Sequence, residues 1–278
     1  MKVRKYSGEL TEFDIDRLRK SLTKSGASED DVEAVLQSIK PRLHDGMHSK
    51  EIYKLSFKEL KKIAHSFAAR YSLKRALRDL GPTGFYFEKW VAKFLECYGY
   101  QTLHNLVLQG HSVSHESDVI ALRENELYWI ECKFRNAMET KIPVTIPMYF
   151  LSRIKDISDK DFSLFGQERK FTNGWLITNS YFTSDSIAFA EYYNMKLLSW
   201  EYPIGNSIKN QVDKKALYPI TCLTTLNIKE KRFLLEKEHI LVKELSENNE
   251  ILEKMGIDFN RRNKIEQEIE ELIPNQAN

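Results

Sequence analysis

The segment YWIECKF, residues 128–134, places Glu131 and Lys133 inside a run of aromatic and β-favouring side chains. Side chains of a strand alternate between two faces, so we expect Glu131 and Lys133 to share one face. Asp118 precedes Glu131 by twelve intervening residues, and a turn predicted at residues 124–126 pairs the two strands in antiparallel fashion. Asp118 is therefore expected near the level of Glu131 or Lys133, which gathers two carboxylates and an amine in one patch.

This patch has the chemistry of a divalent-metal site. Neighbouring carboxylates raise each other's pKa, so the arrangement is favourable only with a cation between them. Lys133 supplies part of that charge, and Mg²⁺ supplies more, because it binds one or two carboxylates together with water and phosphate oxygens. Such an ion polarises a phosphodiester and generates hydroxide, while a nearby ammonium orients the attacking water. The spacing is suited to phosphodiester hydrolysis; the alternative is a solvated pair of charges on an exposed sheet face.

The elements that position these groups form a predicted α/β segment. A helix at residues 85–98 has apolar residues at helical spacing, with Glu88 beside that stripe. Strands are predicted at 101–107, 118–123 and 127–134, followed by an irregular stretch with Pro143 and Pro147 and a helix around 150–157. Residues 174–200 then predict a strand, a helix and a strand, which is typical of a parallel strand pair.

The whole chain has the composition of a globular protein, with 278 residues, 42% hydrophobic content and a net charge of +2. Basic residues exceed acidic ones in residues 1–80, with 18 Lys and Arg against 12 Asp and Glu. The three cysteines have no CxxC spacing, which argues against a zinc ribbon or a disulfide scaffold and favours a reducing compartment. No signal peptide or long apolar run is seen. We therefore expect a cytoplasmic protein with no membrane contact.

Turn-forming residues and changes of pattern divide the chain into three predicted domains, at residues 1–80, 81–214 and 215–278. The first is predicted to have a strand pair around a Ser7-Gly8 turn, then helices at 14–25, 28–40 (capped by Ser28) and 49–76, the last in one or two pieces. The last is helical and highly charged, and we expect it to pack or to dimerise through a helix pair. Its tail, residues 274–278, is predicted to fray.

The order Asp118, then Glu131-Cys132-Lys133, resembles the D…ExK signature of PD-(D/E)xK nucleases, with Ser117 in place of the leading Pro. The segment GFYFEKWVAKFLECYGY, residues 84–100, resembles the helix before the catalytic strands of Mrr-like restriction endonucleases. Residues 111–121 resemble the family's stretch around its metal-binding Asp, and residues 174–200 resemble its later strand-helix-strand. The likeness runs over roughly residues 84–202.

This resemblance implies a restriction-endonuclease-like mixed sheet flanked by helices, and a site that uses Mg²⁺ or Mn²⁺ on DNA. It implies that Asp118 and Glu131 bind the metal, that Lys133 assists the water, and that Glu88 is the family's additional helix carboxylate. Among other polar residues, His111 and His115 lack a third ligand, so we predict a loop or DNA-facing role for them. Glu116, two residues before Asp118, is predicted to lie on solvated surface, with a spare carboxylate of the site as the alternative, and a strand end with an N-cap is predicted for residues 178–183.

Residues 3–22, VRKYSGELTEFDIDRLRKSL, resemble the opening of the ATP-cone, a regulatory domain of ribonucleotide reductases and of their transcriptional repressor. The matching positions are Val3, Lys5, Gly8, Phe13 and Asp14, and Arg17 stands where the family has Lys. Residues 47–77 resemble the closing helices, with Ser49 at the position of a nucleotide-contacting hydroxyl. The resemblance implies that ATP or dATP binds near Val3, Lys5, Arg17 and Ser49. Tyr6 and Thr11 depart from the family pattern, and a basic arm that touches the DNA backbone is the alternative.

Together these patterns lead to a principal hypothesis: a Mg²⁺-dependent, Mrr-like DNA endonuclease of restriction or defence type, regulated by an adenine nucleotide and assembled as a homo-oligomer. A nucleotide-responsive DNA-binding regulator without cleavage activity is the second hypothesis, and an RNA-directed nuclease is the third. No P-loop motif occurs, so ATP hydrolysis by that route is not predicted.

Overall fold

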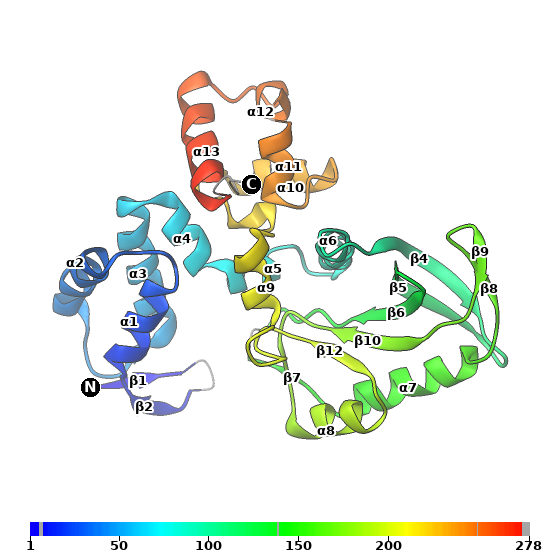
Figure 1. Ribbon diagram of the computed structural model, residues 1–278. Coiled ribbons are helices and arrows are strands. Elements are labelled where there is room, and N and C mark those ends of the chain that lie inside the picture. Colours follow the sequence, from blue (N-terminus) through cyan, green and yellow to red (C-terminus); the bar gives the residue numbers. More distant parts are fainter. Residues whose placement is uncertain (6–7, 138, 249, 274–278) are drawn as a thin grey trace. The chain divides into compact units, whose positions relative to one another are not determined.

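A computed structural model of the protein describes residues 1–5, 8–137, 139–248 and 250–273. The chain forms two compact units, and Figure 1 gives the labels of their elements. The first unit combines residues 1–76 with residues from 220 onward, and the second comprises residues 77–219. Within the described residues, no helix combines the length and the apolar character that crossing a lipid bilayer requires.

The first unit begins with a three-stranded sheet in the order β2-β1-β3, covered by helices. The strands are β1 (Lys2–Arg4), β2 (Leu10–Glu12) and β3 (Met47–His48), with β1 antiparallel to β2 and parallel to β3. The helices are α1 (Ile15–Thr23), α2 (Glu29–Ile39), the 3-10 turn η1 (Lys40–Arg42), α3 (Ser49–Ile63), α4 (His65–Tyr71) and α5 (Leu73–Arg78). Val3 and Met47 join the apolar faces of α1, α2 and α3 in one core. Ser28 caps α2 as predicted, whereas Ser7 of the predicted turn lies outside the described residues.

The C-terminal part of this unit is helical. It consists of η2 (Ile220–Cys222), α10 (Ile228–Glu236), α11 (Val242–Glu247), α12 (Glu250–Lys254) and α13 (Phe259–Leu272). Helix α13 packs against α4, where Ser66 Oγ donates to Glu271 Oε2 at 2.6 Å. Lys61 Nζ of α3 donates to the carbonyl of Thr224 at 2.8 Å. The C-terminal helices therefore pack within the same unit as the N-terminal ones; the predicted frayed tail lies outside the described residues.

The second unit is built on a five-stranded mixed sheet in the order β12-β10-β6-β5-β4. Its strands are β4 (Gln101–Gln109), β5 (Ser114–Arg123), β6 (Glu126–Cys132), β10 (Asn173–Ile177) and β12 (Lys196–Leu198). Strands β4, β5 and β6 form an antiparallel meander, and β10 runs parallel to both β6 and β12. Two small ladders lie outside this sheet: β7 (Lys141–Ile142) with β11 (Tyr181–Phe182), and β8 (Phe162–Leu164) with β9 (Gln167–Arg169).

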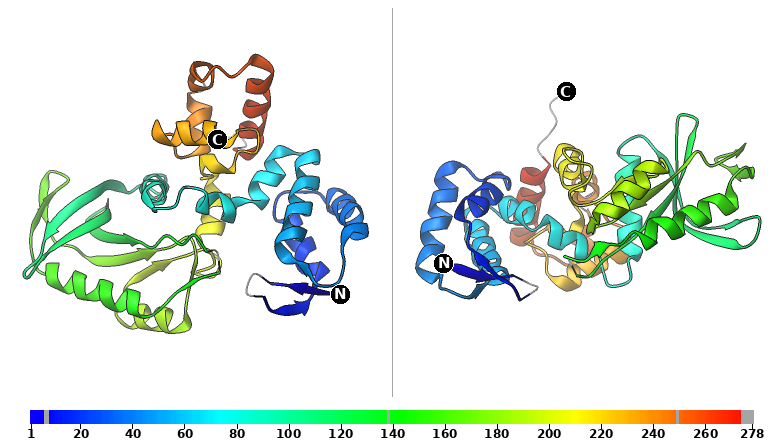
Figure 2. Two further views of the ribbon diagram at one scale, coloured as in Figure 1. Left: turned by 180° about the vertical axis from the view of Figure 1, so that it is seen from behind. Right: turned by 90° about the horizontal axis from the view of Figure 1, so that it is seen from below.

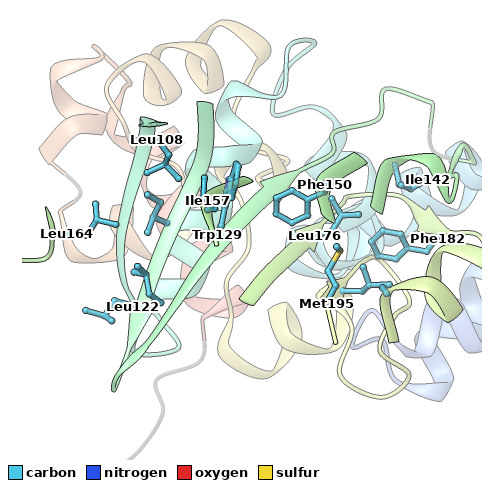
Figure 3. Packing of buried hydrophobic residues seen from close by; sticks show 14 residues of the cluster. Leu108, Leu122, Trp129, Ile142, Phe150, Ile157, Leu164, Leu176, Phe182 and Met195 are labelled. Atoms are coloured by element: carbon cyan, nitrogen blue, oxygen red, sulfur yellow. The ribbon is translucent and has the colours of Figure 1, made fainter. Parts of the chain in front are cut away.

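Helices cover both faces of this sheet. Helix α6 (Phe85–Glu96) lies on one face, while α7 (Thr145–Ile157) and α8 (Ser184–Tyr192) lie on the other, as Figures 1 and 2 show. The remaining helix, α9 (Ile208–Lys215), follows β12 in sequence. Figure 3 shows Trp129, Phe150 and Leu176 in the apolar core of this unit, where the rings of Trp129 and Phe150 meet edge to face at 5.4 Å. This core fixes β6 and α7 against each other.

The predicted fold class is confirmed: a mixed sheet flanked by helices, with a mostly helical N-terminal part that contains a short hairpin and a helical C-terminal part. The predicted parallel strand pair is β10 and β12. Strand β5 starts at Ser114, earlier than the predicted residue 118, so Asp118 lies within the strand.

Two predicted helices differ from the structure, and one hairpin is additional. Residues 49–76, predicted as helix in one or two pieces, form the three helices α3, α4 and α5; Ala64 is extended (φ −149°, ψ 138°) and ends α3. Helix α7 begins at Thr145 rather than near residue 150. Pro147 is its third residue, in the first turn, where a missing amide proton costs no intrahelical hydrogen bond. The β8–β9 hairpin was not predicted.

Candidate active site

The β5–β6 register brings Asp118 and Glu131 to the same level of the sheet. Val119 pairs with Ile130, and just beyond this pair the amide of Cys132 donates to Oδ2 of Asp118 at 2.7 Å. This register follows from the tight turn at residues 124–125, where Glu124 adopts a positive φ of 58°. The two carboxylates that were predicted to lie together therefore do so, on adjacent antiparallel strands.

Glu131 is a buried carboxylate with a cation on each oxygen. Its exposed fraction is 4%. Lys133 Nζ donates to Oε1 at 2.5 Å, and Arg153 Nη1 donates to Oε2 at 2.5 Å. Arg153 comes from α7 and was not predicted. The only sequence signal for it is a cation three residues after Phe150, on the helix stripe that also carries Ile154 and Ile157.

Glu88 reaches this site from the first turn of α6. The helix begins after Gly84, whose φ of 90° favours glycine. A Cβ at Gly84 would lie 3.1 Å from Cβ of Phe134 and 3.6 Å from Glu88 Oε1, so the bare backbone allows this close approach. Phe134 follows Lys133 in the chain and packs against Phe87 at 5.7 Å between ring centroids. The start of α6 and the end of β6 are thereby held together.

The pKa values of Asp118 and Glu88 are both raised, mainly by burial and further by the neighbouring carboxylates. Burial, together with the nearby Glu131 and Glu88, raises the pKa of Asp118 to about 7, despite the opposing effects of the Cys132 amide and Lys133. Burial, together with Glu116 and Glu131, also raises the pKa of Glu88. Asp118 and Glu88 therefore belong to one desolvated cluster of acids.

Polar residues that follow β10 hold the backbone of the ExK segment. The amide of Lys133 donates to the Ile177 carbonyl at 2.8 Å, and Thr178 Oγ1 donates to the Lys133 carbonyl at 2.5 Å. Asn179 makes two bonds to Arg135, accepting from its amide at 2.8 Å and donating to its carbonyl at 3.0 Å. Thr178 and Asn179 thus fix the chain on both sides of Phe134, and with it the base of the Lys133 side chain.

The two histidines lie around a turn that Asp156 holds in place. Asp156 of α7 accepts from the amide of Ser112 at 2.9 Å and from its hydroxyl at 2.6 Å, and it lies 2.8 Å from His115 Nε2. A Cβ at Gly110 would lie 2.0 Å from Asp156 Oδ2, so this contact needs glycine. His111 Nε2 lies 3.0 Å from the Ser158 carbonyl. Both histidines therefore help to anchor the β4–β5 turn to the end of α7.

Replacing Asp156 is expected to weaken this anchor in a pH-dependent way. The hydroxyl of Ser112, with His115 and the Ser112 and Val113 amides, holds the pKa of Asp156 well below its usual range. A carboxyl with a lowered pKa stabilises the fold fully above its unfolded pKa, about 4, and loses that effect as the pH falls through its folded pKa. We therefore expect Asp156→Asn to lower the free energy of unfolding most near neutral pH, with a difference that shrinks below about pH 4.

Urea titrations followed by tryptophan fluorescence would measure this difference, because all four tryptophans lie in the second unit. Asp161→Asn is the matched control, since Asp161 is 58% exposed and its nearest cation is 3.9 Å away. A constant difference between Asp156→Asn and the wild type from neutral to acid pH would contradict the assigned role.

The donor set fits a hard divalent cation. Asp118 and Glu131 offer carboxylate oxygens at one level of the sheet, and burial beside Glu131 and Glu88 raises the pKa of Asp118, so a bound cation would stabilise its ionised form. Across the part of the chain that the structure describes, no three His, Cys, Asp or Glu side chains are gathered as a metal cluster. Mg²⁺ needs no such cluster, because it binds through one or two carboxylates and completes its shell with water and phosphate oxygens.

The residues predicted for nucleotide binding lie around the small sheet of the first unit. Lys5 follows β1 and pairs with Glu9 at 3.2 Å. Ser49 begins α3 directly after β3, which pairs with β1, so Lys5 and Ser49 follow neighbouring strands. Val3 is 7% exposed and belongs to the core, whereas Arg17 is exposed on α1. The roles of these four residues stay predictions.

Three family models match the chain in sequence order. They are the ATP cone domain over residues 1–80, the restriction endonuclease family Mrr_cat over residues 81–201, and the AF1548-like C-terminal family over residues 218–273. The first two confirm the resemblances to an ATP-cone and to an Mrr-like restriction endonuclease. The third was not predicted, because the charged helical pattern after residue 215 carried no recognised motif.

Individual proteins with a similar sequence or structure extend these matches. An uncharacterized protein of Archaeoglobus fulgidus is 36% identical over 137 residues, which cover 48% of this chain and 71% of that protein. The crystal structure of a protein of unknown function, AF1548, is 28% identical with a TM-score of 0.54, over 68% of this chain and 97% of that one. The structure of Can2 from Sulfobacillus thermosulfidooxidans, in complex with cyclic tetra-adenylate, matches 72% of this chain and 54% of that one at 17% identity. Its TM-score of 0.33 is too low to support an argument. The chain therefore belongs to the same family as the Archaeoglobus protein, and it consists of an ATP-cone domain, a restriction endonuclease domain and an AF1548-like C-terminal domain.

Proposed function

We propose that the protein is a Mg²⁺- or Mn²⁺-dependent DNA endonuclease of restriction or defence type, whose activity responds to ATP or dATP bound at its ATP-cone. The observation that carries this proposal is the convergence of Asp118, Glu131 and Lys133 on adjacent strands of a restriction endonuclease domain. Glu88 adds a fourth charged group to the same place. The expected homo-oligomer and the cytoplasmic location stay predictions.

Each residue has a distinct part in the proposed hydrolysis. Asp118 and Glu131 would hold the divalent ion, which would supply polarisation of the phosphodiester and a lowered pKa of an attacking water. The ammonium of Lys133, whose side chain is partly exposed beside the buried Glu131, orients the attacking water and offsets charge on the scissile phosphate. Glu88 increases the negative charge that attracts the ion. Burial raises the pKa of the Cys132 thiol, so this residue between Glu131 and Lys133 stays protonated and is no nucleophile.

A cleavage assay on supercoiled plasmid, methylated and unmethylated, tests the proposal. We expect nicked or linear product with Mg²⁺ or Mn²⁺ and none with excess EDTA. We also expect a changed rate when ATP or dATP is added, and loss of that change in a Lys5→Ala, Arg17→Ala double variant. Metal-independent binding of DNA without product would favour a nucleotide-responsive regulator, and cleavage of RNA alone would favour an RNA nuclease. Either result would overturn the proposed DNA endonuclease.

A further inference from the structure

Arg153 is held in place at the site by contacts on several sides of its guanidinium. Nη1 donates to Glu131 Oε2 at 2.5 Å, and Nη2 donates to the backbone carbonyl of Glu116 on the neighbouring strand. Its central carbon lies 4.7 Å from the ring centroid of Trp129 and 5.8 Å from that of Tyr149. Only 11% of its side chain is exposed. A buried guanidinium that is bound and stacked in this way has little freedom to leave Glu131.

Lys133 holds the other oxygen of Glu131 less firmly. Its Nζ donates to Oε1 at 2.5 Å, and its side chain is 27% exposed. An ammonium on a flexible stem rotates and exchanges partners, whereas the planar guanidinium is preorganised for its hydrogen bonds. The two oxygens of Glu131 therefore differ: Oε2 has a fixed partner in Arg153, and Oε1 has an exchangeable partner in Lys133.

We propose that Arg153 is a positioning residue of this site, which stays on Oε2 of Glu131 and so keeps Oε1 available to the divalent ion when Lys133 releases it. The proposal rests on the proposed metal-dependent function and assigns a role to a residue outside the D…ExK pattern. Groups that hydrogen-bond a ligating carboxylate fix its orientation, and their loss costs about 10–100-fold in metal affinity. A purely electrostatic role would have the opposite sign, because removing a nearby cation strengthens metal binding.

Mn²⁺ titrations of the full-length protein, with free Mn²⁺ measured by electron paramagnetic resonance, separate these two effects. We expect Arg153→Met to raise the dissociation constant for Mn²⁺ about 10–100-fold. Lys133→Met removes the same charge but frees Oε1, so we expect it to lower the dissociation constant. Lys155→Met removes a charge from the same helix at a residue that lies near Tyr193 instead, and we expect a change of less than about twofold because salt screens distant charges.

A double-variant cycle tests the route through Glu131. With Glu131→Gln already present, Arg153→Met should cause no further loss of Mn²⁺ affinity. Circular dichroism and tryptophan fluorescence check the fold. If Arg153→Met does not fold, Arg153→Lys is used instead. We expect Arg153→Lys to lose part of the Mn²⁺ affinity, because a lysine keeps the charge but cannot hydrogen-bond Glu131 and the Glu116 carbonyl at the same time, as the guanidinium does.

The proposal would be overturned by an Arg153 variant that binds Mn²⁺ as tightly as the wild type or more tightly, or by a loss that persists beside Glu131→Gln. A wild-type protein that binds no Mn²⁺ would overturn it together with the proposed function. Plasmid cleavage by the same samples distinguishes the two failures. If the wild type cleaves plasmid and Arg153→Met binds Mn²⁺ with unchanged affinity, only the role of Arg153 is contradicted. If Mn²⁺ binding depends on Arg153 but no sample cleaves plasmid, only the proposed endonuclease activity is contradicted.

Discussion

Asp118→Asn and Lys133→Ala are each expected to lower the rate of DNA cleavage by more than about 100-fold while leaving the fold intact. Asn in place of Asp118 removes the charge of a proposed metal ligand but keeps an oxygen that can accept from the Cys132 amide, now 2.7 Å away. Ala in place of Lys133 removes the ammonium that orients the attacking water. A positioned acid or base of this kind raises the rate of the reaction by about 10²–10⁴-fold. Single-turnover rates on supercoiled plasmid, with excess Mg²⁺, measure both losses.

Glu124→Gln is the matched control for these variants. Glu124 lies in the turn of the same β5–β6 hairpin, at the opposite end from the site, and its side chain is 82% exposed. We expect this variant to cleave at the wild-type rate. Near-normal cleavage by both Asp118→Asn and Lys133→Ala would remove the site from the reaction, whatever the fold of the domain.

The sequence predicted those parts of the fold that depend on local patterns. The β5–β6 hairpin follows from a two-residue turn between β-favouring runs, and the β10–α8–β12 unit follows from a strand, a helix and a strand in close succession. The β8–β9 hairpin was missed because each strand has only three residues, and its turn depends on Phe165 and Gly166 with φ of 53° and 75°. A Gly in a two-residue turn between short alternating runs is the signal that could have found it.

The residues of the candidate site likewise divide into those that a local sequence pattern predicts and one that it does not. Asp118, Glu131 and Lys133 lie on one hairpin, so counting residues from its turn is enough to predict their approach. Arg153 reaches Glu131 only because the packing of Trp129 against Phe150 sets α7 across the sheet, and no local pattern determines that placement. Contacts between distant segments decide which cation a buried carboxylate meets, and a single sequence does not show them.

Glu268→Ala is expected to destabilise the first unit by about 2–5 kcal/mol, because it leaves two partly buried amides and a hydroxyl without their acceptor. Glu268 of α13 is 1% exposed and accepts from the amide of Thr224 at 2.7 Å, and from the amide and hydroxyl of Thr225 at 2.9 and 2.6 Å. Thr224 in turn binds the cone helices, since its carbonyl accepts from Lys61 and its hydroxyl lies 2.6 Å from His65 Nδ1. One carboxylate therefore fixes the turn through which the C-terminal helices contact the ATP-cone.

Hydrogen exchange at the amides of Thr224 and Thr225, together with thermal unfolding by far-ultraviolet circular dichroism, measures this loss. Tryptophan fluorescence serves as an internal reference, because all four tryptophans lie within residues 77–219 and report on the second unit alone. Glu270→Ala is the matched control, since Glu270 is exposed two residues further along the same helix. Equal exchange rates and unfolding midpoints in the two variants would contradict the role of Glu268. Faster exchange confined to Glu268→Ala, with an unchanged tryptophan signal, would instead tie the C-terminal helices to the stability of the ATP-cone and not to that of the nuclease domain.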